Sequence, residues 1–186
     1  MAELFDKFKN AVATIRDLPL LGLRLLLAVV FFGPAMIKLN NFDGTVMWFN
    51  SLGIPFPVLN AYLSTATETA GVVLLLLGLG TRLISIPLII SMIVALVTVH
   101  IDHGWSVIGQ SSVSEIAGRV DMAREILREY GNYDWLTEKG SFVILQNGME
   151  NVVTYMVMLL TLVVYGPGRL SIDALIASKF KKGKKS

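Results

Sequence analysis

The chain has 186 residues, of which 54% are hydrophobic and only 16% are charged. Its mean hydropathy of +0.64 lies well above that of soluble domains, so a soluble protein is excluded and a membrane protein of one domain is expected. The chain carries a net charge of +2 and no cysteine. The missing thiols exclude disulfides, thiolate metal sites and covalent haem attachment by this chain.

Four apolar runs are each long enough to cross a bilayer as a helix, which takes about 20 residues. They cover residues 18–39, 57–80, 83–100 and 142–165. The sequence therefore predicts an all-α integral membrane four-helix bundle, with residues 1–186 forming a single transmembrane domain. The 104–141 insertion between the third and fourth spans is left outside the membrane.

Lysine and arginine are concentrated in the N-terminal segment, in the hairpin that carries Arg82, and in the tail beyond residue 165. By the positive-inside rule, these segments are predicted to be cytoplasmic, so that the chain is multi-pass with both termini inside. The basic tail directly follows a span, which favours contact with anionic lipid and no nucleic-acid partner.

The 104–141 insertion has the pattern of an amphipathic surface helix. It opens with a capping box, Ser112 with Glu115, and ends at Gly131, with apolar residues at helical spacing between them. We expect this helix to lie along the outer membrane surface. A second surface helix is expected inside, between Phe5 and Ile15.

Polar side chains within the spans need a reason, because they are costly in lipid. Glu68 would lie about 15 Å deep, near the bilayer midplane. Arg24 and Lys38 come from the first span, and Asn147 and Glu150 come from the fourth. In one interpretation Glu68 forms a buried ion pair with Arg24, and the chain is a non-catalytic membrane scaffold.

A second interpretation is a quinone or quinol pocket, since a flat apolar ring in lipid needs hydrogen-bond partners for its two oxygens and a route for protons. The predicted catalytic residues are Glu68, His100 and Glu150. The predicted cofactor-binding residues are Arg24, Lys38, Glu68, His100, Asn147 and Glu150.

A third interpretation is a metal site at the end of the third span. His100, Asp102 and His103 offer nitrogen and oxygen ligands that suit copper or zinc. No haem is expected, because both histidines lie on one helix end, whereas two axial histidines between helices would come from different ones.

The first three spans resemble the DoxX family of small four-helix membrane proteins. The resemblance covers roughly residues 20–103 and rests on "LGLRLLLAVVFFGPAMIKLNNF", "SLGIPFP", the acid in "STATETAGVVLLLLGLGTRL" and a helix ending at His100. It implies a bacterial inner (plasma) membrane protein, and some DoxX relatives are subunits of quinone-reducing systems. Arg24, Lys38, Glu68 and His100 match the recurrent polar positions of the family.

The downstream segment "AREILREYGNYDWLTEKGSFVILQNGMENVVTYMVMLL" is similar to the HvfX-type branch, whose members are associated with copper-binding modified peptides. We therefore expect a membrane subunit that binds quinone or quinol and assists electron or proton transfer at the outer side. A soluble or membrane redox partner would supply the electron carrier, so the chain would be an oxidoreductase subunit. The alternatives are an accessory protein for a copper-binding peptide system and a scaffold, and a homo-oligomer is also considered.

Overall fold

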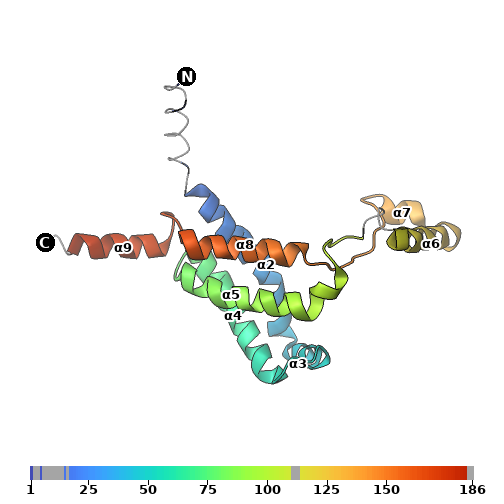
Figure 1. The fold of residues 1–186 in the computed structure, drawn as a ribbon, viewed down its shortest axis with the longest axis horizontal. Coiled ribbons are helices and arrows are strands. Elements are labelled where there is room, and N and C mark those ends of the chain that lie inside the picture. The colour runs from blue at the N-terminus through green and yellow to red at the C-terminus, as the bar shows by residue number, and fades with distance from the viewer. Residues whose placement is uncertain (2–4, 6–14, 16, 110–113, 184–186) are drawn as a thin grey trace. The chain divides into compact units, whose positions relative to one another are not determined.

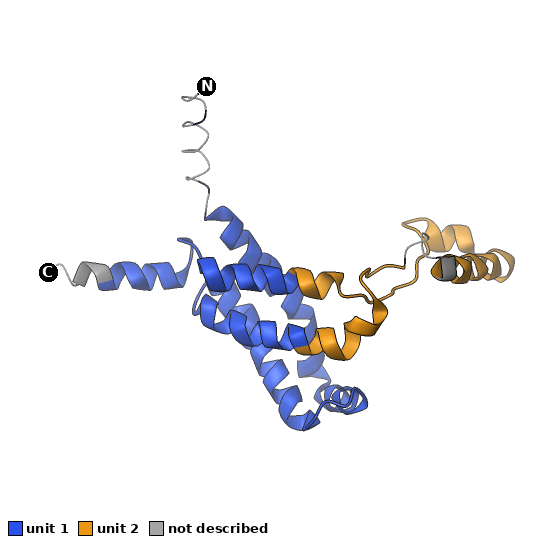
Figure 2. Ribbon diagram, in the orientation of Figure 1, with its two compact units in different colours: residues 1–93, 155–186 blue, residues 94–154 orange. Residues whose placement is uncertain are grey.

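The structure is a computed structural model that describes residues 1, 5, 15, 17–109 and 114–183. Within these residues the regular elements are helices, apart from one isolated β-bridge (Figure 1). The chain forms two compact units, residues 1–93 with 155–186 and residues 94–154 (Figure 2). The predicted all-helical membrane bundle is confirmed.

Among the residues that the structure describes, three helical segments are long and apolar enough to cross a membrane. They are α2 (Leu18–Asn40), α4 (Pro57–Leu77) and the continuous helical run from Thr81 to His103. These helices lie where the first three spans were predicted. The apolar helix α8 (Glu150–Tyr165) has 16 residues and rises about 24 Å, which is less than the roughly 30 Å of a bilayer core.

The core of the first unit is built from α2, α4, α5 (Thr81–Ala95) and the C-terminal half of α8. Its buried cluster consists of Leu27, Ala28, Phe31, Leu75, Ile84, Leu88, Leu159 and Leu162. Many other leucines, valines and isoleucines of these helices are exposed. An apolar exterior is the expected surface of helices that face lipid.

Helices α3 (Phe42–Ser51) and α9 (Ile172–Gly183) are among those that were not predicted from the sequence. Helix α3 occupies most of the link between the first two spans, and the side chain of Asn41 caps its start by accepting from Gly44 N at 3.1 Å. Helix α9 occupies the basic tail. Both are short segments beside apolar runs, where the hydropathy pattern alone carries little signal.

The third span changes its winding before it ends. After α5 come a π-helical turn η1 (Leu96–His100) and a 3₁₀ turn η2 (Ile101–His103). Gly104 then ends the helix with a φ of 73°, a conformation that favours glycine. Single π-helical turns are frequent at functional sites in helices, so His100 lies at a position of interest.

The predicted start of the fourth span at residue 142 is wrong, because α8 begins at Glu150. Residues 142–145 are extended, and their exposure alternates between half-buried and exposed. Their backbone pairs with the segment after η2, as Gly109 N donates to Ile144 O at 2.8 Å and Ile108 bridges Leu145. A short apolar run of this kind cannot be separated from a helix by its hydrophobicity alone.

In the second unit, the predicted insertion helix is present as α6 (Ser114–Tyr130), followed by α7 (Tyr133–Thr137). Val120 is buried as expected, whereas Met122 and Ile126 are exposed on the face expected to be charged. The predicted cap by Ser112 and most of the predicted N-terminal surface helix lie outside the described residues.

One end of the first unit is joined by two carboxylates. The Asp173 carboxylate, in the first turn of α9, accepts from Gly80 N at 2.9 Å and Thr81 N at 3.2 Å, and so caps the start of α5 from the tail. Asp17, before α2, accepts from Arg169 N at 3.0 Å and contacts its guanidinium at 3.4 Å. The tail is therefore part of the bundle rather than an appendage.

Asp173→Ala should lower the free energy of unfolding in detergent by about 1 kcal/mol, because two amide donors at the start of α5 lose their acceptor. Glu129→Ala, at an exposed position of α6, is the matched control and should have almost no effect. Thermal unfolding followed by circular dichroism measures both. Equal melting temperatures for the two variants would show that the cap does not hold the hairpin.

Candidate functional site

A buried ion pair joins the end of α2 to the middle of α4. Lys38 Nζ donates to Glu68 Oε1, and the two side chains are 12% and 4% exposed. Ser64, one turn before Glu68, donates its hydroxyl to the same oxygen at 3.2 Å. Glu68 Oε2 is buried and has no hydrogen-bond partner among the described residues. The carboxylate is therefore only partly satisfied, since buried polar atoms normally have hydrogen-bond partners.

The pairing of Glu68 with Arg24 is wrong, because Lys38 is its partner. Lys38 lies 14 residues beyond Arg24, about 21 Å further along α2. Arg24 is buried at the other end of this helix, where its Nη2 donates to Leu170 O. Sequence spacing placed both cations on one span but could not set the register of α2 against α4.

Arg24 occupies the junction between the hairpin and the tail. A Cβ at Gly78 would lie 1.7 Å from Arg24 Nη1, and Gly78 also has a φ of 63°, so only glycine fits there. This close packing leaves no room for a ligand beside Nη1. The predicted cofactor-binding role of Arg24 is not supported by its surroundings, which indicate that it packs the end of the bundle.

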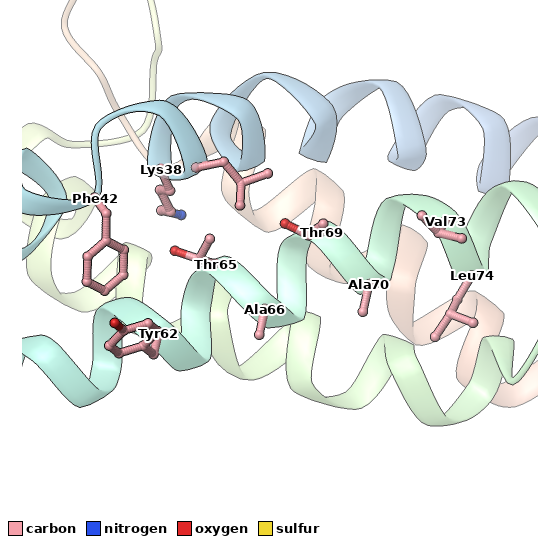
Figure 3. A pocket seen from close by; sticks show the side chains of 10 residues that line it. Lys38, Phe42, Tyr62, Thr65, Ala66, Thr69, Ala70, Val73 and Leu74 are labelled. Atoms are coloured by element: carbon pink, nitrogen blue, oxygen red, sulfur yellow. The ribbon is translucent and has the colours of Figure 1, made fainter.

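An apolar groove of about 660 Å³ opens beside the ion pair. It is lined by Lys38 and Leu39 at the end of α2, by Phe42 of α3, and by α4 residues between Tyr62 and Leu74. In Figure 3, Lys38, Phe42 and Tyr62 lie at one end of the groove, and Val73 and Leu74 lie at the other. The groove thus has a cationic, aromatic end and an aliphatic end.

Three features of the groove could hold a ring with polar oxygens. The rings of Phe42 and Tyr62 lie 4.3 Å apart between centroids, tilted by 41° to each other, and form an aromatic wall. The Lys38 ammonium has three donors, of which the Glu68 bond uses one. Thr69 lines the groove, and its Oγ1 is buried without a hydrogen-bond partner in the described chain, so the bonding capacity of this hydroxyl is unfilled.

Sequence reasoning missed the α4 face that lines the groove. Its members follow helical spacing, at positions Tyr62, Thr65, Ala66, Thr69, Ala70 and Val73. The mixture of hydroxyls and alanines on one face was the available signal. The charge of Glu68 led to the prediction of a site on the face through Ser64 and Glu68, whereas the groove lies on the neighbouring face.

The predicted residues of the later spans lie in the second unit. His100 Nδ1 is 2.7 Å from Asn147 O, and a carbonyl can only accept, so Nδ1 carries the hydrogen. The Nε2 atom of a neutral His100 is then an acceptor. Asn147 therefore contributes its backbone, held with a φ of 62°, rather than its amide side chain.

Glu150 connects the start of α8 with the loop after η2. Its Oε2 accepts from Val107 N at 3.1 Å, and its backbone N donates to Trp105 O at 2.9 Å. Gly148 makes this contact possible, because a Cβ there would lie 2.4 Å from Ser106 O. Glu150 thus has a structural partner in the same unit.

The three predicted metal ligands do not gather into a metal site. His103 is exposed, and its Nδ1 is 2.7 Å from Val99 O. Throughout the part of the chain that the structure describes, no group of three histidine, aspartate or glutamate side chains is placed to hold a metal ion. His100, Asp102 and His103 accordingly do not form a ready-made ligand set.

These observations define a class: a small helical membrane protein with a buried ion pair that borders a groove between its first two long helices. Residues 19–101 match the DoxX family. The chain belongs to this family, and the match contains the whole groove together with His100. Its boundary near η1 leaves the insertion and α8 outside the shared region.

Two relatives support this membership. "Putative oxidoreductase CatD" of Bacillus subtilis (strain 168) is 33% identical over 79 residues, which cover 42% of this chain and 58% of that protein. "Inner membrane protein YphA" of Escherichia coli (strain K12) is 31% identical over 96 residues, 52% of this chain and 67% of the relative. The chain thus spans little more than half the length of the first relative. No solved structure matches the chain.

The ion pair is tested by a double-mutant cycle. Lys38→Met and Glu68→Gln should each lower the free energy of unfolding, Lys38→Met by about 3 kcal/mol, because it leaves a buried carboxylate unpaired. The double variant should lose at least about 1 kcal/mol less than the sum of the two. For Arg24→Met with Glu68→Gln, we expect the losses to add. The free energies are measured by denaturant unfolding in detergent. If Glu68 were coupled to Arg24 and not to Lys38, the assigned ion pair would be wrong.

Proposed function

We propose that this protein is a membrane subunit that binds quinone or quinol in the groove beside Lys38 and Glu68, and that it assists proton and electron transfer with a partner protein. The observation that carries the proposal is a buried ion pair bordering an apolar groove that also holds an unpaired hydroxyl. Buried polar atoms without partners, next to space for a ligand, are typical of binding sites.

The chemistry of a quinone suits these groups. One ring oxygen would accept from the Lys38 ammonium, and the Thr69 hydroxyl would serve as a second hydrogen-bonding group. The ring would lie against Phe42 and Tyr62. Oxidation of a quinol to a quinone releases two protons and two electrons, and Glu68, which contacts the lining residue Lys38, is a carboxylate that could accept one of the protons.

In this proposal the electrons pass to a carrier outside this chain. The sequence has no cysteine, and the described residues contain no ready-made metal site. A soluble or membrane redox partner would therefore exchange electrons with the bound quinol. One relative is named as an oxidoreductase, which supports this class of reaction for the present chain.

We place the protein in a bacterial inner membrane with both termini cytoplasmic and with the Lys38 end of the groove toward the outer side. The arginines and lysines of the hairpin and the tail support this orientation. A relative named as an inner membrane protein supports the location.

Ligand binding is tested by thermal unfolding with a short-chain ubiquinone analogue. The analogue should raise the melting temperature of the wild type, because a ligand that binds only the folded state stabilises it. The increase should be smaller in Lys38→Met and in Thr69→Val, which remove donors to the ring oxygens. Thr154→Val, an exposed threonine of α8, is the matched control and should behave as the wild type.

The variant His100→Ala tests whether the second unit takes part in quinone binding. If this variant loses the ligand-induced increase while Lys38→Met keeps it, the quinone site lies at His100 and the groove is not the binding site. If the analogue raises the melting temperature of neither the wild type nor any variant, the proposed quinone binding is wrong. The two remaining hypotheses are then a scaffold and the copper-peptide function of the HvfX-type resemblance, and metal analysis of the purified protein distinguishes them.

The orientation is tested with single cysteines, which are clean probes because the chain has none of its own. Cysteines at the exposed positions Asp43 and Lys139 should react with a membrane-impermeant maleimide in intact spheroplasts. A cysteine at Ser178, on α9, should react only after the cells are broken. Reaction of Ser178→Cys in intact spheroplasts would place the tail outside and contradict the orientation.

A further inference from the structure

We infer that the groove takes a ligand with a long prenyl tail, which enters sideways from the lipid and lies along α4 with its polar ring beside Lys38. This rests on the proposed quinone function and specifies the form of the ligand. The site would therefore be built for a membrane-resident quinone rather than for a small aromatic compound that arrives from water.

The mouth of the groove lies on the lipid side of the helix. Tyr62 and Val73, at its two ends, are 61% and 50% exposed, and the alanines between them are exposed as well. They belong to an apolar helix that is long enough to span a membrane. Side chains exposed on such a helix face lipid, so a ligand reaches them by lateral diffusion.

The groove is polar at one end only. Lys38 and Thr65 lie near the end that holds the aromatic pair, and the opposite end consists of Val73 and Leu74 (Figure 3). From Tyr62 to Leu74 the helix rises about 18 Å. A molecule with a polar head and a linear apolar tail matches this gradient, whereas a tail-less ring would fill the polar end and leave the aliphatic end unused.

Two alanines keep the middle of the groove open. Ala66 and Ala70 lie one turn apart on the α4 face, between the polar and the aliphatic end. The volume of about 660 Å³ is in the range of pockets that enclose drug-sized molecules, which exceeds the needs of a bare ring. A bulky side chain at Ala70 would separate the two ends and obstruct only the tail.

The experiment compares ubiquinone carrying its full prenyl tail with the same ring lacking a tail, using protein in phosphatidylcholine nanodiscs. Ligand amounts are expressed as mole fraction in the bilayer, so that partitioning does not count as affinity. The wild type should bind the tailed quinone at least about tenfold more tightly, because the tail buries apolar surface against α4. Ala70→Phe should remove this preference, because it weakens binding of the tailed quinone far more than binding of the tail-less ring. Val29→Phe, at a position of α2 that is 71% exposed and outside the groove, should alter neither.

The outcomes separate the inference from the function on which it rests. If Ala70→Phe weakens both compounds equally, or if the wild type has no preference for the tail, quinone binding stands and the tail path is wrong. If phosphatidylglycerol displaces the tailed quinone at equal mole fraction, the groove is a general lipid site and the inference fails. If neither quinone binds to the wild type, the proposed function fails as well.

Discussion

The Lys38–Glu68 ion pair is the contact on which the membrane part of this structure depends. Both side chains are removed from water, where each would be hydrated, and neither charge is tolerable alone in an apolar bundle. The pair therefore requires α2 and α4 to meet in one register. Its consequences reach the groove, because the same register brings Lys38 to the edge of the α4 face that lines it.

A second polar contact acts at the opposite end of α2. Helices in lipid gain little from the hydrophobic effect when they associate, so close packing and polar contacts determine how they fit. Arg24 bonds Leu170 O and packs on Gly78, and the carboxylate of Asp173 caps the neighbouring hairpin. One cation at each end of α2 thus fixes this helix, and the Lys38 end borders the apolar groove.

The region shared with the DoxX family and the insertion differ in the groups that they offer to a ligand. The region matched by the DoxX family contains the pair, the groove and His100, whereas the insertion with α6 and α7 lies beyond it. In the second unit, His100 and Glu150 each hold backbone groups of nearby segments. One ring nitrogen of His100 and one carboxylate oxygen of Glu150 are therefore engaged, while Glu68 Oε2 and Thr69 Oγ1 are buried without partners among the described residues. Of the buried polar atoms without partners in the described chain, Thr69 Oγ1 belongs to a residue that lines the groove, which is why the ligand is placed there.

The sequence by itself determined the class of the protein, the positions of the first three spans and the identity of the costly charges. These properties are local: a run of about 20 apolar residues forms a helix in lipid whatever its neighbours are, and Glu68 is costly wherever such a run places it. The helix α6 was also predictable, because its apolar residues repeat at helical spacing.

Only the tertiary structure decided which cation meets Glu68, where α8 begins and where the groove lies. Arg24 and Lys38 are on the same span, and the choice between them depends on how α2 is shifted along α4. Residues 142–145 are extended because their backbone groups pair with the segment after η2, which lies more than 30 residues earlier in the chain. The groove forms where α2, α3 and α4 meet. Each of these features depends on contacts between distant segments, and the composition of one segment does not contain that information.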